Sequence, residues 1–214
     1  MSVNRKSWIR ETVEAIVIAL ILALFIRTFV VQAFKIPSSS MEDTLLVGDH
    51  LLVTKFAYGI SLPFSDSKIL QLSKPQRGDI IVFEFPEDRS KDFIKRVIAI
   101  EGDTIEIKDK KIFINGKPFD DPYGVHKEEL VLPRMGACNS YEGSMDHCRD
   151  NFGPMKIPKE SVFVMGDNRD RSYDSRYWGF VNLNIIEGKA WRIYWSWNGG
   201  ERKVRWNRLG SSID

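Results

Sequence analysis

An apolar segment near the N-terminus constrains this chain more than any other feature of its sequence. Residues 13–34 read VEAIVIALILALFIRTFVVQAF, and the apolar run from Ala15 to Ile26 is uninterrupted. A helix needs about 20 predominantly apolar residues to cross a bilayer. Apolar side chains occupy all faces of such a helix, which argues against one that packs a single stripe onto a soluble core. The sequence therefore predicts a transmembrane anchor over residues 13–34.

Basic residues give the anchor a direction. Arg5, Lys6 and Arg10 precede it, and the excess of Lys and Arg on the cytoplasmic side of membrane helices predicts that residues 1–12 are cytoplasmic. A cleavable signal peptide is the main alternative, because small residues at a suitable spacing follow near the end of the segment. Arg27 interrupts the apolar stretch where such a peptide is smooth, which favours a retained anchor.

Beyond the anchor the pattern changes from helical to β. Short runs of β-branched and aromatic residues are separated by Gly, Pro and Asn-Gly turns, which is typical of antiparallel sheets. We predict a mainly β fold: an antiparallel β-sheet domain over residues 35–104 and 159–214, preceded by one N-terminal transmembrane helix. The polar, turn-rich stretch within residues 105–158 is predicted to form a smaller inserted β/loop domain.

Charge and cysteine content exclude some functions. The chain has 31 Lys and Arg against 29 Asp and Glu, a net charge of +2, which gives no electrostatic basis for binding nucleic acid. Cys138, Cys148 and the adjacent His147 are too few ligands for a zinc site. A local disulfide is favoured if this region lies outside the cytoplasm, and two unpaired thiols in a loop are the alternative.

A serine triplet, Ser38 to Ser40, follows Pro37 just past the anchor. A serine hydroxyl is a weak nucleophile and needs a neighbouring base. His50 could supply one in a Ser-His-Asp arrangement. A polar linker is the alternative for the triplet alone.

Lys95 is the other candidate base. It lies in an apolar strand, and alternation places Phe93 and Val97 on its face. Burial among such side chains can lower the pKa of a lysine by up to about 3–5 units, which makes the neutral amine available. Because the other face of this strand also carries apolar residues, a lysine that reaches the surface is the alternative.

A loop of mixed charge, GDNRDRSYDSRYWG at residues 166–179, follows an apolar run. Asp/Arg pairs and Asx turns can order such a loop at the surface. The alternative is a scaffold that presents Ser172 to an active site.

Taken in order, these segments resemble type I signal peptidases, the bacterial leader peptidases. The anchor is followed by PSSSM at 37–41, GD at 78–79, KR at 95–96, GD at 102–103 and the long block at 166–179. The resemblance covers nearly the whole chain. Two positions depart from it: Asp43 stands where the family usually has proline, and Ser39 stands where glycine is common. The first puts the turn after the serine triplet in question.

The resemblance implies a Ser/Lys dyad serine protease whose larger domain is catalytic. It implies Ser40 as nucleophile, Lys95 as general base, and Ser38 as an oxyanion-hole hydroxyl working with the Ser40 N–H. Ser172 then orients the lysine amine. Asp174 and Arg176 hold the loop, and no metal or cofactor is required.

The implied substrates are signal peptides of exported preproteins with small residues one and three positions before the cut. The implied location is the bacterial cytoplasmic (inner) membrane, single-pass, with the body extracytoplasmic. Trp191, Ile193, Trp195 and Trp197 alternate onto one predicted strand face, which predicts either contact with membrane lipid or a buried core face.

Two other functions fit parts of the sequence. One is a self-cleaving Ser/Lys peptidase of the SOS repressor type, against which the anchor and the 166–179 block speak. The other is a non-catalytic, membrane-anchored envelope protein that binds through its β body.

Overall fold

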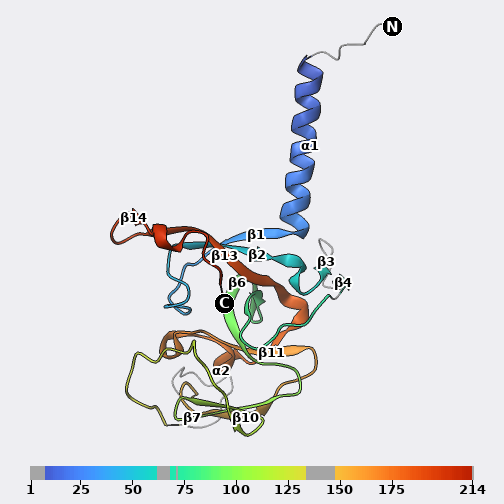
Figure 1. Cartoon of the computed structure of the whole chain (residues 1–214). Coiled ribbons are helices and arrows are strands. Elements are labelled where there is room, and N and C mark those ends of the chain that lie inside the picture. Colours follow the sequence, from blue (N-terminus) through green and yellow to red (C-terminus); the bar gives the residue numbers. More distant parts are fainter. Residues whose placement is uncertain (1–7, 62–67, 71, 134–147, 214) are drawn as a thin grey trace.

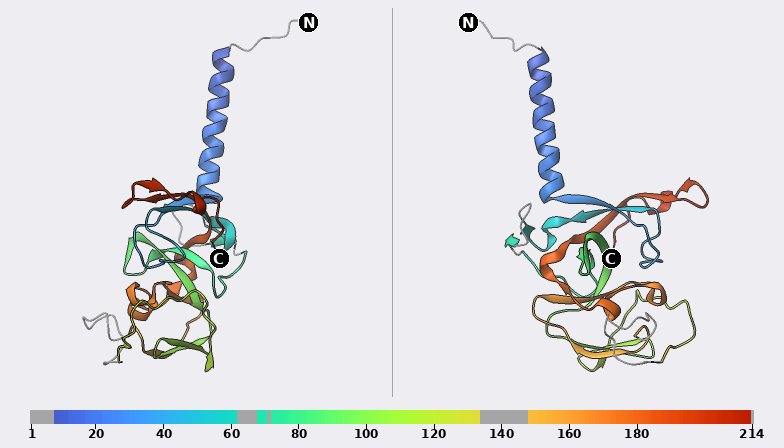
Figure 2. Two further views of the ribbon diagram at one scale, coloured as in Figure 1. Left: turned by 60° about the vertical axis from the view of Figure 1, so that its left-hand side comes forward. Right: turned by 180° about the vertical axis from the view of Figure 1, so that it is seen from behind.

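The apolar segment forms a helix that stands clear of the rest of the molecule. The computed structural model describes residues 8–61, 68–70, 72–133 and 148–213. Helix α1 (Trp8–Phe29) projects from the body in every view (Figures 1 and 2). None of its residues is buried, and it is long and apolar enough to cross a membrane. At 1.5 Å per residue it is about 33 Å long, which matches a hydrocarbon core of about 30 Å.

The boundaries of this helix differ from the predicted segment, residues 13–34. The helix begins at Trp8 and ends at Phe29, and residues 31–34 belong to strand β1 (Val31–Lys35). The reason is tertiary: the backbone from Val31 pairs with β2 (Asp49–Thr54), from Val31 opposite Thr54 to Lys35 opposite His50. A single residue, Val30, connects the helix to the sheet.

An eight-stranded antiparallel sheet forms the body next to α1. Its order is β1-β2-β13-β5-β6-β11-β12, and β14 pairs with β13. The remaining strands of this sheet are β5 (Ile80–Phe85), β6 (Asp88–Ala99), β11 (Ser161–Met165), β12 (Val181–Asn182), β13 (Ile186–Asn198) and β14 (Lys203–Val204). Figure 1 shows β1, β2, β13 and β14 in the layer adjoining the helix.

A smaller sheet lies at the end of the body away from α1 (Figure 1). Its four strands are ordered β10-β7-β8-β9, with bounds β7 (Thr104–Lys108), β8 (Lys111–Ile114), β9 (Lys117–Pro118) and β10 (Phe152–Lys156). A separate two-stranded sheet joins β3 (Ile60–Ser61) to β4 (Lys68–Leu70). The mainly antiparallel β fold with one N-terminal apolar helix is therefore confirmed.

Short helical turns complete the described part of the chain. They are η1 (Lys55–Ala57), η2 (Arg169–Arg171), α2 (Ser175–Trp178), η3 (Leu183–Ile185) and η4 (Trp206–Arg208). The side chain of Asp174 caps α2 by accepting the Arg176 N–H, which satisfies one of the amides that a helix start leaves unpaired.

Three apolar clusters fix the sheets around the centre of the molecule. One packs β5, β6 and β11 against α2, a second joins the smaller sheet to the larger one, and a third lies under β1, β2 and β13. Strand β6 is buried on both faces over its last five residues, Lys95 to Ala99. Any polar side chain in that half of β6 is therefore held out of water and needs a partner.

Strand β13 departs from strict alternation. Its register against β2 shifts between Ala190 and Arg192 and again between Ile193 and Trp195. Each bulge inserts an extra residue and turns the following side chains to the other face. Ile193 is therefore buried in the core, while Trp191, Trp195 and Trp197 are exposed. The predicted single face of four apolar residues is corrected to three exposed tryptophans and one core isoleucine.

Candidate active site

Two side chains from distant parts of the sequence meet in the interior of the larger sheet. Lys95 Nζ lies 2.6 Å from Ser40 Oγ. Ser40 belongs to the turn that follows β1, and Lys95 lies within β6, opposite Ile81 of β5. Both residues are nearly out of solvent, with exposed fractions of 8% for Ser40 and 4% for Lys95. The hydroxyl and the amine that the sequence analysis paired are in direct contact.

The surroundings of Lys95 favour a neutral amine. Burial lowers the pKa of Lys95 to about 8; the negative charge of Asp174 opposes this change, and the positive charge of Arg176 adds to it. The ring of Phe93 lies 5.5 Å from the amine, as alternation along β6 predicts. At pH 7 about one amine in ten is then neutral, against about one in a few thousand for an ordinary lysine.

Ser38 lies beside this pair. Its hydroxyl oxygen is 3.5 Å from Ser40 Oγ. Among the residues that the structure describes, no acceptor takes the backbone N–H of Ser40. Two donors next to Ser40 Oγ are thus available to an oxygen that develops negative charge there.

The loop at residues 166–179 is held by a buried ion pair. Arg176 Nε and Nη2 each lie 2.9 Å from a carboxylate oxygen of Asp174, and neither side chain is more than 1% exposed. Arg176 also donates to the carbonyl oxygens of Arg149 and Arg169. Burial acts to raise the pKa of Asp174, but the Arg176 charge and several hydrogen bonds outweigh it and lower that pKa. The predicted Asp174–Arg176 pair is present and ionised.

Ser172 is placed differently from the sequence expectation. Its hydroxyl oxygen accepts the Gly166 N–H at 3.1 Å, and the side chain also hydrogen-bonds Asp174. In the part of the chain that is described, the Lys95 amine bonds Ser40 and not Ser172. A hydroxyl has one proton, and a carboxylate is the stronger acceptor for it. Ser172 therefore supports the loop through Asp174.

Gly166 lies between the Ser172 side chain and the Ser40 backbone, where no residue with a Cβ atom fits. A Cβ at this position would lie 2.3 Å from Ser172 Oγ and 2.4 Å from the Ser40 carbonyl oxygen. The loop thus passes directly behind the Ser40 backbone, at a distance that only glycine permits.

Sequence reasoning missed a second buried pair that joins three segments. Arg96 donates to both carboxylate oxygens of Asp167 at 2.9 Å, and Thr44 Oγ1 donates to the same carboxylate at 2.6 Å. Tyr123 covers the Arg96 guanidinium at 3.6 Å. This arrangement ties the strand that carries Lys95, the 166–179 loop and the turn after Ser40. Arg96 could have been noticed from its position inside an apolar strand, where a charge needs a partner.

Asp43, which stands where the family usually has proline, has an unusual backbone conformation. Asp43 has φ of +79°, in the left-handed region that residues other than glycine, asparagine and aspartate rarely adopt. The proline ring fixes φ near −65°. The turn after Ser40 therefore has a backbone that proline could not adopt.

The remaining candidates lie elsewhere. His50 is in β2, with its ring edge-on to Tyr194 at 5.9 Å, and His126 contacts Asp170. Cys148 forms a disulfide, whereas Cys138 and His147 lie outside the described residues. Within the described ranges, His, Cys, Asp and Glu form no group of three that could hold a metal ion.

Comparisons with known proteins identify the family of this chain. The family model described as "Signal peptidase, peptidase S26" matches residues 9–195. The signal peptidase I of Pseudomonas fluorescens is 38% identical over 213 residues, 91% of this chain and 75% of that protein. The signal peptidase I of Aquifex aeolicus is 36% identical over 228 residues, 87% and 84% of the two chains.

A solved structure is also similar. A signal peptidase I from Enterococcus faecalis is 32% identical, with a TM-score of 0.42 over 56% of this chain and 98% of that one. The match of the family model to most of the chain, and of curated relatives above 30% identity over most of their length, leads to one conclusion. The chain belongs to the signal peptidase family, peptidase S26.

Proposed function

We propose that Ser40 and Lys95 are the nucleophile and the general base with which this chain, a signal peptidase, removes signal peptides from preproteins. The observation that supports these roles is the 2.6 Å contact between the two side chains, together with the lowered pKa of Lys95. A serine becomes a nucleophile when a neighbouring group can take its proton. The neutral amine of Lys95 meets that requirement at the only polar contact that its Nζ makes with a described side chain.

The reaction proceeds in two acyl-transfer steps. Lys95 Nζ takes the proton of Ser40 Oγ while that oxygen bonds to the scissile carbonyl carbon. The Ser38 hydroxyl and the Ser40 N–H donate to the oxyanion, a contribution of about 3–4 kcal/mol per donor in comparable sites. Protonated Lys95 gives its proton to the leaving amine. A water molecule then loses a proton to Lys95 Nζ and attacks the ester carbon. The bond from that carbon to Ser40 Oγ breaks, Lys95 returns the proton to Ser40 Oγ, and the signal peptide leaves as a carboxylic acid.

Activity should rise with pH through the pKa of Lys95. The reactive form is the neutral amine, so kcat/KM for a signal-peptide substrate is expected to rise with a midpoint at about pH 8 and to level off about one pH unit above it. The measurement is a pH–rate profile of the full chain in detergent between pH 6 and 11. A midpoint above pH 10 would show that Lys95 titrates like a lysine in water and would remove its role as base.

We extend the proposal to the substrate preference and to the orientation of the chain in the membrane. We propose that small residues one and three positions before the cut are selected because shallow pockets exclude larger side chains. Arg5 and Lys6 before α1, and Arg10 near its start, favour a cytoplasmic N-terminus by the positive-inside rule. The catalytic body then lies on the extracytoplasmic side of the bacterial inner membrane.

We also propose that the β13–β14 edge rests on membrane lipid. Trp191, Trp195, Trp197 and Trp206 are 47%, 37%, 40% and 72% exposed. The first three belong to β13, which Figure 1 shows in the layer that adjoins α1. The Arg192 guanidinium lies 5.5 Å from the ring of Trp191. Tryptophan with arginine is the combination that favours a lipid headgroup region.

Quenching of tryptophan fluorescence tests this contact. In liposomes that contain lipids brominated near the headgroup, the full chain should be quenched, and Trp195→Phe with Trp197→Phe should remove a substantial part of that quenching. Trp178→Phe is the control, because Trp178 is only 7% exposed and packs in the core beside Phe83. Equal quenching in the double variant and the wild type would contradict the contact.

A further inference from the structure

Asn168 makes two contacts with the peptide units on either side of Ser40. Its side-chain Nδ2 donates to the Ser39 carbonyl oxygen at 3.1 Å, and its backbone N–H donates to the Ser40 carbonyl oxygen at 3.1 Å. Nδ2 also lies 3.4 Å from a carboxylate oxygen of Glu42. Both side-chain partners are acceptors, so the amide must present its nitrogen to them.

The bond to Ser39 fixes the direction of the Ser40 N–H. The Ser39 C=O and the Ser40 N–H belong to one planar trans peptide and point in opposite directions. The Ser39 oxygen is held by Asn168 Nδ2 and by the Glu42 N–H at 3.0 Å. The Ser40 N–H is therefore aimed away from both donors, and it is left without an acceptor among the described residues.

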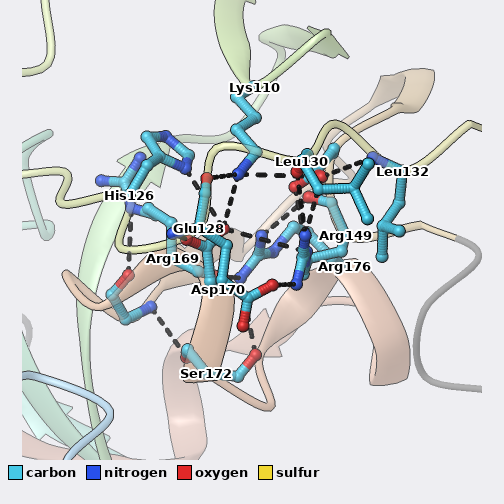
Figure 3. A network of polar contacts seen from close by, with 12 residues as sticks. Lys110, His126, Glu128, Leu130, Leu132, Arg149, Arg169, Asp170, Ser172 and Arg176 are labelled. Atoms are coloured by element: carbon cyan, nitrogen blue, oxygen red, sulfur yellow. Dashed lines mark hydrogen bonds and ion pairs between the residues drawn. The ribbon is translucent and has the colours of Figure 1, made fainter.

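The backbone segment that carries Asn168 is held by hydrogen bonds of the two residues that follow it. Its neighbour Arg169 donates to the Gly166 and Val125 carbonyl oxygens. Asp170, one residue further, accepts from Lys110 Nζ at 3.1 Å and from the Glu128 N–H at 2.8 Å, and it contacts His126 (Figure 3). The network in Figure 3 thus anchors Asp170, two residues after Asn168, to Lys110 and Glu128.

This placement leaves one polar atom of Asn168 unsatisfied. Asn168 is fully buried, and its Oδ1 has no hydrogen-bond partner among the described residues. A buried acceptor without a partner is destabilising, and such atoms are rare in proteins. An apolar side chain would avoid that loss, but it could not hold the Ser39 oxygen.

We propose that Asn168 is a positioning residue for the oxyanion hole: by holding the Ser39 carbonyl, its side chain keeps the Ser40 N–H pointed at the developing oxyanion. The inference rests on the proposed roles of Ser40 and its N–H. If the Ser39–Ser40 peptide rotates, that donor is lost while Ser40 Oγ and Lys95 Nζ stay in contact. Loss of the Asn168 side chain would then weaken the stabilisation of the transition state, and it would leave the proton transfer from Ser40 to Lys95 unchanged.

The test compares Asn168→Ala with the wild-type full chain in detergent. We expect kcat for a signal-peptide substrate to fall by about ten- to a hundredfold, less than the 10²–10³-fold loss of a whole donor, with KM within about twofold. A substrate-like peptide aldehyde, which forms a tetrahedral adduct with Ser40, should bind more weakly by a similar factor. The midpoint of the pH–rate profile should not move, because the surroundings of Lys95 are unchanged.

Asn151→Ala is the matched control. Asn151 Nδ2 also donates to a backbone carbonyl, that of Leu132, at 2.9 Å. This variant loses the same kind of hydrogen bond next to β10 of the smaller sheet, and also the bond that Asn151 Oδ1 accepts from the Asp109 N–H at 3.1 Å. Its melting temperature should therefore fall while its kcat stays within about twofold. Asn168→Asp keeps the size of the side chain and turns an acceptor toward the Ser39 oxygen; its kcat should fall at least as much as that of Asn168→Ala.

Several results would overturn the inference. They are an unchanged kcat in Asn168→Ala, a loss of kcat with no loss of aldehyde affinity, a shifted pH midpoint, or failure of both Asn168 variants to fold, which would mark a purely structural residue. Ser40→Ala separates this inference from the proposed function. If Ser40→Ala is inactive and Asn168→Ala is fully active, only the inference on Asn168 fails; if Ser40→Ala retains activity, the proposed function fails.

Discussion

Replacing Lys95 with methionine is expected to abolish cleavage and to stabilise the protein at neutral pH. The loss of activity should be at least about 10³-fold, because no other described side chain contacts the Ser40 hydroxyl as a base. The gain in stability follows from burial. Lowering the pKa of a lysine from 10.5 to about 8 costs the folded state about 3 kcal/mol at pH 7, and methionine, an apolar side chain of similar length, avoids that cost.

The pH dependence of this gain has a defined direction. Between pH 8 and 10.5 the unfolded chain binds a proton at Lys95 that the folded chain has released, so the stability of the wild type rises with pH in this window. Lys95→Met should lack that rise. Thermal unfolding of both proteins at pH 7 and pH 10 should therefore show a difference in midpoint that shrinks at the higher pH.

Ser40→Ala serves as the comparison. It should lose activity to a similar degree, because it removes the attacking oxygen, but it keeps the lysine and should not gain stability. Substantial cleavage by either variant would end the assignment of the dyad. An equal stability of Lys95→Met and wild type at pH 7 would mean that the amine is solvated.

Replacing Asp174 with leucine should have the largest effect on stability. Arg176 would remain buried without its counter-charge, and removing one partner of a buried ion pair costs about 3–5 kcal/mol. The residual bonds of Arg176 to the Arg149 and Arg169 carbonyls do not neutralise its charge. We expect a large drop in the thermal midpoint, or loss of folded protein at 37 °C.

The double variant with Asp174→Leu and Arg176→Met should recover much of that loss, because it removes both charges. Asp88→Ala breaks an exposed ion pair with Lys91 and should leave the thermal midpoint nearly unchanged.

The charge of Asp174 also raises the pKa of Lys95. Residual activity of Asp174→Leu should therefore have its pH midpoint below that of the wild type, and a midpoint at higher pH would contradict this account.

The sequence predicted the parts of this molecule that depend on local pattern or on resemblance. Alternation along β6 placed Phe93 on the side of Lys95, and the family motif pointed to Ser40, the one of three adjacent serines whose hydroxyl contacts Lys95 Nζ. The end of α1 could not be predicted in the same way. Residues 31–34 are as apolar as the helix, and only their pairing with β2 makes them a strand.

The finer geometry depends on contacts between distant segments. Two bulges in β13 decide that Ile193 is buried while its tryptophan neighbours are exposed, and alternation alone cannot show a bulge. The ion pair of Arg96 could not be predicted, because its partner Asp167 lies 71 residues away in the sequence. Asn168 carries no signal in its own segment, because its role is set by a carbonyl 129 residues earlier.

The one-residue connection at Val30 has a consequence for how the enzyme meets its substrates. Since α1 passes almost directly into β1, we expect the height of Ser40 above the bilayer to change only when the anchor tilts. A preprotein held by its own apolar segment diffuses in the same two-dimensional layer, at a far higher effective concentration than in solution. We therefore expect the choice of bond to depend partly on depth, with a matching sequence cut when its own apolar segment presents it at the level of Ser40.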